Sequence, residues 1–376
     1  MTLPTHAEDR LARSVLGPSL GVQPNEVVTI ESWSHALPWA LALVREVRRR
    51  RAKPILVVED EETFFESLRV VRPNSVPQIP LSLVEASDVY VYLPGPESFP
   101  RLFGLNDREL HRVVSRFDAQ WWRAARQRRV RFARLAIASA TSTAADHFGI
   151  DVEGWSREVW RASLFPPGQL RRKGRHLLRR LARARRVRVR HPNGTDWAVE
   201  LRKGRGFVED GRVDTEDYRS GHLATQVPSG LVAVSLRSST AEGVWESNRQ
   251  TYHRFQDPPT AVGARFVFRD GRLKEYSFDR GGEAFAATYA RGGRGRDRAT
   301  RLTFGLNPAI VRAPEFEEIA DGMVTLWLGS DRPPPERGPV PFSFLSPLAG
   351  ADVEVDGEQW WVGGRPVRVA RRAGPS

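Results

Sequence analysis

The chain has 376 residues, of which 40% are hydrophobic and 27% are charged, which is typical of globular proteins. Its length allows two domains with separate cores, and the absence of cysteine excludes disulfides, iron–sulfur clusters and a thiol nucleophile. No segment approaches the roughly 20 apolar residues of a membrane span, and residues 1–17 lack the apolar stretch of a signal peptide. We therefore expect a soluble cytoplasmic protein without membrane contact.

The net charge of +13 would permit binding to nucleic acid or another polyanion. Arginine supplies most of the positive charge and is spread along the whole chain among frequent Ala, Gly and Pro, as expected of a GC-rich coding sequence. We interpret this charge mainly as solvated surface, which makes nucleic acid a disfavoured partner. Polyanion binding stays an alternative function.

The first half of the chain alternates short apolar runs with amphipathic stretches. Strands are predicted at 26–31, 54–58, 88–93 and 130–139, and helices at 37–51, 64–71, 107–128 and most of 154–187. This alternation predicts an α/β domain with a largely parallel sheet over residues 1–185. The arginine-rich run 171–190 is interpreted as a solvated helix surface, with phosphate binding as the alternative.

After residue 190, strand signals separated by turn dipeptides dominate. Asp270-Gly271, between two apolar alternating runs, predicts a hairpin. Strands are predicted at 197–201, 231–236, 265–269, 274–278, 323–328 and 359–362. Residues 186–376 are therefore predicted to form an α+β, strand-rich domain, with 332–341 as a proline-rich loop.

A search for catalytic motifs finds none of the common ones. The sequence has no phosphate-binding glycine loop, no G-x-S-x-G elbow and no H-x-x-x-H or H-E-x-x-H pattern. The acidic runs 59–62 and 315–318 are interpreted as a strand end and a helix start rather than a cation site.

Several segments carry spaced Gly, Pro, Asn and Asp residues in a distinctive order. They are LGVQPNEVVTI (20–30), TSTAADHFGID (141–151), GTD (194–196), VPSG (227–230), FVFRDGRLKEY (266–276), GLNP (305–308) and DGMVTLWLG (321–329). Their order over nearly the whole chain resembles the thermophilic metallo-aminopeptidases of the aminopeptidase T family. The resemblance implies a two-domain fold, a homodimer, and a two-metal centre in the second domain with glutamate, histidine and aspartate ligands.

The same resemblance places the metal-ligand positions on side chains that cannot serve. They fall on Leu231, on or beside Arg301, on Thr325, near Arg332, and within 342–348, which contains neither histidine nor aspartate. Leucine and threonine do not supply the anionic or imidazole ligands of a divalent pair, and arginine repels a cation. We therefore predict a divergent member without metal or other cofactor, which is not an active metallopeptidase.

The function predicted from this loss is binding of a peptide in the former metal cleft. A precursor peptide held for partner modifying enzymes, as in peptide natural-product biosynthesis, is the setting that the fold history suggests. The predicted peptide-binding residues are Leu231, Arg237, Trp245, Arg301, Asn307, Thr325 and Arg332. Tryptophans 327, 360 and 361 are further candidates for apolar walls.

An enzymatic role is disfavoured but left open, and no catalytic residue is assigned. The alternative is a metal-independent enzyme that acts on a peptide in the same cleft. Its acid or base would come from His222, Glu242, Tyr252 or His253, although their spacing indicates no particular mechanism.

Overall fold

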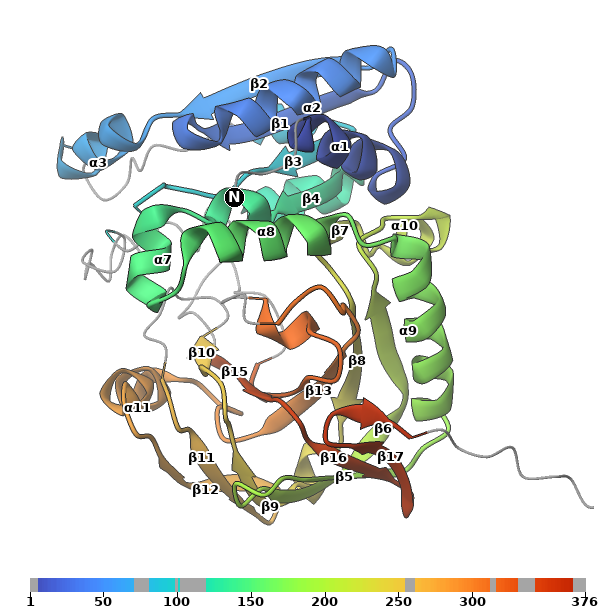
Figure 1. Cartoon of the computed structure of the whole chain (residues 1–376), viewed down its shortest axis with the longest axis vertical. Coiled ribbons are helices and arrows are strands. Elements are labelled where there is room, and N and C mark those ends of the chain that lie inside the picture. The colour runs from blue at the N-terminus through green and yellow to red at the C-terminus, as the bar shows by residue number, and fades with distance from the viewer. Residues whose placement is uncertain are drawn as a thin grey trace, which may run out of the picture.

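A computed structural model describes residues 6–70, 81–98, 101, 120–253, 261–311, 316–330 and 342–367, without the side chains of 68–70, 220 and 253. Within these residues the chain forms a five-stranded parallel sheet and a thirteen-stranded antiparallel sheet. The parallel sheet lies above the antiparallel one in Figure 1. The predicted fold class, an α/β part with a largely parallel sheet and a strand-rich α+β part, is confirmed.

The parallel sheet has the strand order β2-β1-β3-β4-β7. Its strands are β1 (Val27–Trp33), β2 (Lys53–Glu59), β3 (Val89–Tyr92), β4 (Arg131–Leu135) and β7 (Ala224–Val227). The helices that accompany it are α1 (Ala7–Ser14), α2 (Leu37–Arg49), α3 (Glu61–Val70), α4 (Leu81–Ala86), α7 (Ser142–Phe148) and α8 (Val152–Ser163). In α2, Ala40, Leu43 and Val47 recur at helical spacing and are buried.

Short helices and turns complete this part of the chain. Five residues after α1 form η1 (Val15–Ser19), and single 3-10 turns form η2 (Ser34–Ala36) and η3 (Ala136–Ser139). Residues 120–128 are helical, whereas the rest of the helix predicted at 107–128 lies outside the described residues.

Two predicted boundaries in this region were wrong. The strand predicted at 130–139 ends at Leu135, because the next four residues form η3. The stretch 154–187 is mostly helical, as predicted, but its helical part ends at Leu181 and is divided at Pro166 and Pro167 into α8 and α9 (Pro167–Leu181), since proline starts a helix well but cannot continue one. Residues 186–190 form a strand in which buried valines alternate with arginines. The arginine-rich composition obscured this period of two.

The antiparallel sheet is long and curved around the second core (Figure 1). Its main path runs β10-β15-β14-β13-β8-β6-β5-β16-β17-β18, and β9, β11 and β12 branch from it through β6. The strands of the first half of this sheet are β5 (Arg186–Arg190), β6 (Asp196–Glu209), β8 (Leu231–Leu236), β9 (Glu242–Glu246), β10 (Tyr252–His253) and β11 (Arg265–Arg269). The others are β12 (Arg272–Ser277), β13 (Ala299–Gly305), β14 (Val324–Gly329), β15 (Ser343–Leu348), β16 (Asp352–Val355), β17 (Glu358–Val362) and β18 (Arg365–Pro366).

Helices in this half of the chain are few and short apart from α9. They are α10 (Thr215–Ser220), η4 (Ser238–Thr240), α11 (Gly282–Arg291) and η5 (Glu317–Ile319). The hairpin predicted at Asp270-Gly271 joins β11 to β12, and both turn residues have positive φ, as such a turn requires. The proline-rich segment 332–341 lies outside the described residues.

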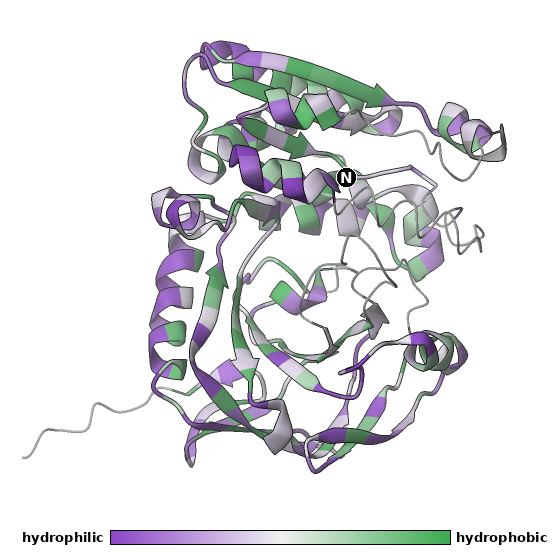
Figure 2. Ribbon diagram, turned by 180° about the vertical axis from the view of Figure 1, so that it is seen from behind, coloured by the Kyte–Doolittle hydropathy of each residue, from purple (hydrophilic) through white to green (hydrophobic). Residues whose placement is uncertain are grey.

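Two large hydrophobic cores hold the molecule together. The first lies between the parallel sheet and its helices, includes Val28, Ile30 and Trp155, and extends to Leu231 and Ala233 of β8. The second fills the curve of the antiparallel sheet, where the fully buried Trp197 and Trp245 rings meet edge to face. Figure 2 shows hydrophobic residues along the strands of both sheets, consistent with these two cores.

Two elements cross between the halves of the chain. Strand β7 follows β6 in sequence but pairs with β4 at the edge of the parallel sheet. Helix α9 precedes β5, and its Leu170, Leu177 and Leu181 belong to the second core. The division into domains 1–185 and 186–376 remains a proposal. No helix in the described part of the chain combines the length and the hydrophobicity that crossing a bilayer requires.

Candidate functional site

The two faces of the antiparallel sheet differ at β8, β13 and β14. Leu302 and Phe304 of β13 point into the second core, whereas Arg301 and Thr303 point to the opposite face. Directly paired residues share a face, so the pairing of these strands collects a set of side chains there. We call this set the mixed face: Leu231, Ala233, Arg301, Thr303, Thr325 and Trp327.

Three of the seven predicted peptide-binding residues therefore lie together. Leu231 pairs with Gly305, and Thr325 pairs with Thr303, so both flank β13 from its two sides. Arg301 is two residues before Thr303 on the same strand and the same face. The structure places Leu231, Arg301 and Thr325 on neighbouring strands of the mixed face.

Aromatic rings hold the Arg301 side chain in place. Its guanidinium carbon lies 4.6 Å from the ring centre of Trp327 and 5.1 Å from that of Phe207. At these distances the ring faces attract the cation. Because Phe207 is further packed by His222 at 6.1 Å between ring centres, the positive charge is fixed by a layer of aromatic side chains.

Two hydroxyl groups on the mixed face are buried without a hydrogen-bond partner. Thr303 and Thr325 are both 0% exposed, and neither Oγ1 has a partner within the described residues. Buried polar groups are normally satisfied, and each unsatisfied one costs about 1–3 kcal/mol. The mixed face therefore combines a cation held by aromatic rings with two hydroxyl groups that have no hydrogen-bond partner within the described residues.

The donor set of the mixed face does not fit a divalent-metal centre. Leu231 is apolar, Thr325 offers a neutral hydroxyl, and Arg301 carries a positive charge on or beside a position where the resemblance places a ligand. Across the described residues, no group of three or more His, Asp or Glu side chains could hold a metal ion. Residues 342–348, where the resemblance places a further ligand pair, form Phe342 and β15 and are buried.

The other predicted binding residues lie apart from the mixed face. Arg237 is exposed just after β8 and forms an ion pair with Glu200, at 3.1 Å between Nη1 and Oε2. Trp245 is fully buried in the second core, where its Nε1 donates a hydrogen bond of 3.1 Å to Ser346 Oγ. Arg332 lies outside the described residues.

Asn307 is buried and holds three segments together. Its Nδ2 donates to the carbonyl oxygens of Ser229 at 2.8 Å and of Ala162 at 3.2 Å, and its Oδ1 accepts from Ala309 N at 3.1 Å. These bonds connect the segment after β13 to the end of α8 and to the loop before β8. These contacts are structural. Asn307 lies two residues after the end of β13, outside the mixed face.

Of the further tryptophan candidates, only Trp327 lies on the mixed face. Trp360 is buried in the second core, beneath the Arg180 guanidinium at 3.8 Å from its ring centre. Trp361 stacks on Phe304 with 5.2 Å between ring centres.

Two neighbouring carboxyl groups, which the sequence analysis missed, lie next to the six residues of the mixed face; Asp210 is buried and Glu209 is half-buried. Glu209 is paired with Leu231 and shares its face. Its Oε1 accepts from Thr225 Oγ1 at 2.6 Å and from Ser229 Oγ at 3.2 Å. Burial raises the pKa of Glu209 to about 7 despite these bonds, and burial raises the pKa of the adjacent Asp210 to about 6. The sequence signal that could have indicated this site is the acidic pair Glu209-Asp210 at the end of a strand.

The candidate acid–base residues are not gathered into one constellation. His222 stacks on Phe207 and so lies beside the mixed face, whereas Glu242 is exposed on β9 and accepts from Asp270 N at 2.6 Å. Tyr252 lies on β10 opposite Leu345, and the side chain of His253 is outside the described residues.

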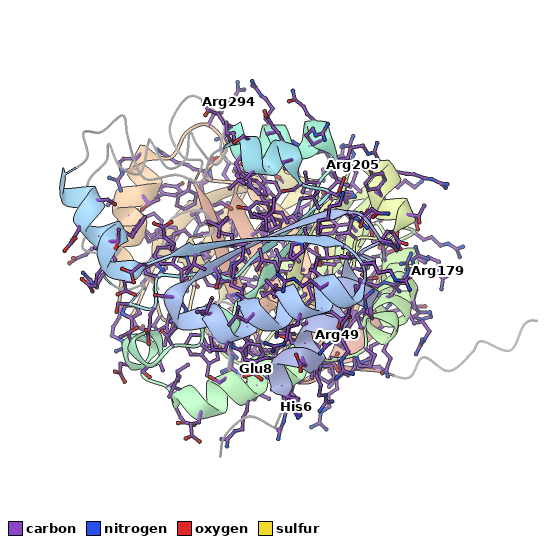
Figure 3. All side chains as sticks on the ribbon, turned by 90° about the horizontal axis from the view of Figure 1, so that it is seen from above. His6, Glu8, Arg49, Arg179, Arg205 and Arg294 are labelled. Atoms are coloured by element: carbon purple, nitrogen blue, oxygen red, sulfur yellow. The ribbon has the colours of Figure 1, made fainter. Side chains whose placement is uncertain are left out.

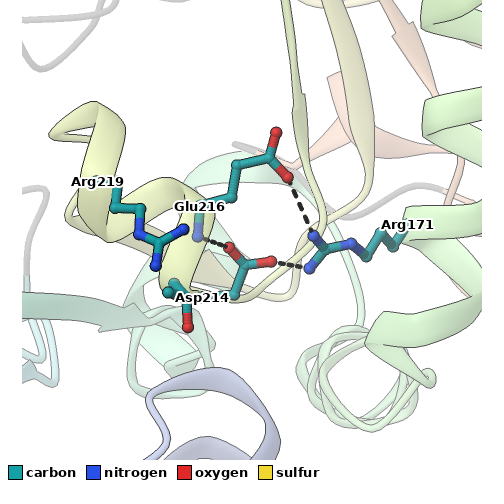
Figure 4. Close-up of a pocket in the computed structure, with 5 residues that line it drawn as sticks. Arg171, Asp214, Glu216 and Arg219 are labelled. Carbon is teal, nitrogen blue, oxygen red and sulfur yellow. Dashed lines mark hydrogen bonds and ion pairs between the residues drawn. The ribbon is translucent and has the colours of Figure 1, made fainter.

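A pocket of ≈ 430 Å³ opens between α9 and α10 and is lined by Arg171, Asp214, Thr215, Glu216 and Arg219. Figure 4 shows Arg171 between the carboxylates of Asp214 and Glu216, with Arg219 on the other side of the pocket. None of the predicted site residues lines it. Because Arg171 is already neutralised there, the pocket is an ion-paired contact between two helices rather than a second site.

Comparison with known proteins shows the fold. No family profile matches the sequence, and no curated protein matches it at a significant level. The structure is similar to wild-type AmpT from Thermus thermophilus, with a TM-score of 0.72 and 16% sequence identity over 96% of this chain and 99% of that one. The chain therefore has an aminopeptidase T-like fold, as predicted.

A second solved structure has the same fold but is named for a different reaction. It is 2,5-dihydroxypyridine dioxygenase from Pseudomonas putida KT2440, with a TM-score of 0.58 and 14% identity over 98% of this chain and 99% of that one. Since a peptidase-named and a dioxygenase-named protein share this fold, the function of the present chain has to be argued from its own side chains.

Proposed function

We propose that this chain is a metal-free, aminopeptidase-like protein that binds a peptide on the mixed face. The observation that carries the proposal is Arg301, which stands on or beside the position where the resemblance places a metal ligand and is held between Phe207 and Trp327. An arginine fixed in this way attracts a carboxylate, whereas a metal centre would need anionic side chains at the same place.

The hydroxyls beside Arg301 complement such a ligand. Thr303 and Thr325 are buried and unpartnered within the described residues, and a hydroxyl both donates and accepts hydrogen bonds. A peptide carboxylate or amide placed against them would satisfy both groups. The proposed ligand is thus a peptide presenting a carboxylate, either its C-terminus or an acidic side chain.

We further propose that the bound peptide is a precursor held for partner modifying enzymes in the cytoplasm, and that the chain works as a homodimer. The support for this setting is the aminopeptidase-like fold combined with side chains on the mixed face that do not fit the two-metal centre implied by the resemblance.

The decisive experiment combines elemental analysis with calorimetry. The purified chain is incubated with zinc, manganese and cobalt, and we expect no metal at stoichiometric levels and no hydrolysis of aminoacyl substrates. Short peptides with free or amidated C-termini are then titrated, and we expect the free carboxylate to bind at least about tenfold more tightly, since this difference corresponds to about 1.4 kcal/mol.

Variants separate the mixed face from general charge. Arg301→Met should abolish the preference for the free carboxylate, whereas Arg237→Met, an equal loss of charge at an exposed residue, should keep it. One or two tightly bound metals per chain together with peptide cleavage would refute the proposal, because the ligands would then have to come from elsewhere.

One observation favours a second function, a metal-independent enzyme on the same face. Glu209, with a pKa raised to about 7, could exchange a proton near neutral pH beside Leu231. The test is hydrolysis of the same substrates in excess chelator between about pH 5 and 8. Turnover that survives chelation and is lost in Glu209→Gln would favour the enzyme, and its absence would favour the binding protein.

A further inference from the structure

Helix α9 separates its positive side chains into two groups. Toward one side, Arg171 pairs with Asp214, and Arg175 pairs with Glu216. Elsewhere on the helix Lys173 lies 3.7 Å from Asp321, and Arg180 lies over the ring of Trp360. These cations are neutralised or packed within the molecule.

The remaining basic residues, three arginines and a histidine, form a stripe on the outward face of α9. We call Arg172, His176, Arg179 and Arg183 the α9 stripe; the first three lie in the helix and Arg183 in the turn that follows it. Their spacing of four, three and four residues places them on one side of the helix, opposite the buried Leu170, Leu177 and Leu181. All four are exposed, and Figure 3 shows Arg179 projecting away from the body of the protein.

Among the described residues, no acidic side chain balances the α9 stripe. The four residues form no ion pair or side-chain hydrogen bond in the described structure, and the sequence has no Asp or Glu between Glu158 and Asp196. Figure 2 colours much of this helix as hydrophilic. Like charges one helical turn apart repel each other, so this arrangement weakens the isolated helix.

Features other than ligand binding account for only part of the stripe. A cation in the last turn of a helix interacts favourably with the helix dipole, which covers Arg179 and Arg183. Arg172 lies in the first half of α9, where the same dipole is unfavourable or absent. Other exposed arginines without ion pairs, such as Arg48, Arg126 and Arg161, lie on separate helices.

A second basic segment lies next to this helix. Strand β6 is irregular between Leu201 and Gly206, and Arg202, Lys203 and Arg205 of this segment are exposed and without ion pairs in the described structure. Leu178 of α9 packs close over Gly206, so the end of the basic segment lies beside the C-terminal half of α9. The unbalanced positive surface thus continues from the helix onto the sheet.

We propose that the α9 stripe docks an acidic helical peptide segment, with the residues 202–205 extending the contact. Successive stripe residues rise about 6, 4.5 and 6 Å along the helix axis, which matches carboxylates spaced at i, i+4, i+7 and i+11 on a second helix. Arginine pairs with such carboxylates in a bidentate manner. The stripe carries no aromatic residue on which bases could stack, which disfavours single-stranded nucleic acid.

This surface is independent of the peptide site proposed on the mixed face. None of its residues belongs to that face, so Arg301→Met should leave docking on α9 unchanged. Conversely, loss of the stripe should leave the carboxylate preference at Arg301 intact. The two proposals can therefore fail separately.

The test uses the full chain and a labelled helical peptide carrying glutamates at i, i+4, i+7 and i+11, with its glutamine counterpart and a short oligothymidylate as comparison probes. Binding is followed by fluorescence anisotropy at about 50 and 300 mM salt, because screening weakens exposed ion pairs. The variant R172Q/R179Q/R183Q is compared with R48Q/R126Q/R161Q, which removes the same charge from scattered exposed sites. Circular dichroism verifies that both variants are folded.

We expect the glutamate peptide to bind the wild type. Its affinity should fall at least about tenfold in the stripe variant and change by less than about threefold in the scattered variant. Three results would overturn the proposal. They are equal weakening by both variants, no detectable binding of the glutamate peptide, and tighter binding of the oligothymidylate that the stripe variant abolishes.

Discussion

The two faces of the antiparallel sheet at β13 and β14 show how one pair of strands serves two purposes. On the inner face Leu302, Phe304, Leu326 and Leu328 are buried together in the second core. On the mixed face the alternating residues are Arg301, Thr303, Thr325 and Trp327. Side chains on both faces are largely buried, with Arg301 half-buried, yet of these two faces only the mixed face carries a charge and hydroxyls without a partner in the described residues.

The difference teaches that burial alone does not distinguish a core from a binding surface. Thr325 and Leu326 are neighbours and both 0% exposed, but one has a polar atom without a partner in the described residues. A protein that evolved only for stability would gain by replacing that hydroxyl with a methyl group. The following substitutions test whether the two faces differ in this way.

The largest expected effect is on the inner face. Leu326→Ala should lower the free energy of unfolding by about 2–5 kcal/mol, because it removes buried methyl groups and leaves a cavity in the second core. Urea denaturation measures the change. Leu41→Ala, at an exposed leucine of α2, is the control and should change stability by less than about 1 kcal/mol. A loss from Leu326→Ala no greater than the control's would mean that the inner face is not a packed core.

A smaller effect is expected at Glu209, beside the mixed face. Its pKa rises from 4.5 to about 7 on folding, so between these pH values the folded chain keeps a proton that the unfolded chain has released. The contribution of Glu209 to stability is therefore present below about pH 4.5 and is lost as the pH rises to about 7. Glu209→Gln cannot titrate and should be more stable than the wild type at pH 8 by up to about 3 kcal/mol.

The measurement is urea denaturation of both chains at several pH values between about 4.5 and 8. Asp210, with its own pKa raised to about 6, stays in the variant, so part of the fall with pH should remain. Glu200→Gln serves as control, since the hydrogen bond from Arg185 lowers the pKa of that half-buried carboxyl. If Glu209→Gln were less stable at pH 8 than the wild type, the carboxyl would be stabilised as an anion.

The smallest effect on stability is expected at Thr325, the residue directly before Leu326, and its sign is opposite to that of Leu326→Ala. Thr325→Val removes the unpartnered hydroxyl and should leave stability unchanged or raise it by up to about 1 kcal/mol. Thr195→Val is the control, because the Thr195 hydroxyl donates to Asn193 Oδ1 at 2.9 Å and accepts from Glu246 N at 3.0 Å, and its loss should destabilise. A clear destabilisation by Thr325→Val would show that its hydroxyl already has a partner. If peptide affinity falls while stability does not, the hydroxyl serves binding.

Much of the fold could be predicted from periodicity. The strands at 231–236 and 265–269 were predicted with the boundaries that the structure has, since both alternate or run apolar between clear turns. The strand at 186–190 was hidden because its three arginines resemble the preceding helix in composition. Strand β7 was missed because it has only four residues and completes a sheet whose other strands lie far earlier in the sequence.

The site could be predicted only in part, for a physical reason. The resemblance led to Leu231, Arg301 and Thr325, which the strand register then places on one face. Glu209 could not be singled out, since its raised pKa arises from burial by residues of several elements. Phe207 and Trp327, the two rings that contact Arg301, are likewise brought to it by strand pairing. Their contact with Arg301 cannot be predicted from local sequence.

The position of β7 at the edge of the parallel sheet has a consequence for how the protein is made. Until residues 224–227 leave the ribosome, the edge of β4 has no neighbour on that side. At about 5–20 residues per second, synthesis of residues 136–223 takes on the order of 4–18 s, during which an unpaired strand edge is open to wrong partners. The nascent chain therefore depends on this late-arriving strand to close its first sheet, and slow translation through this region should increase aggregation.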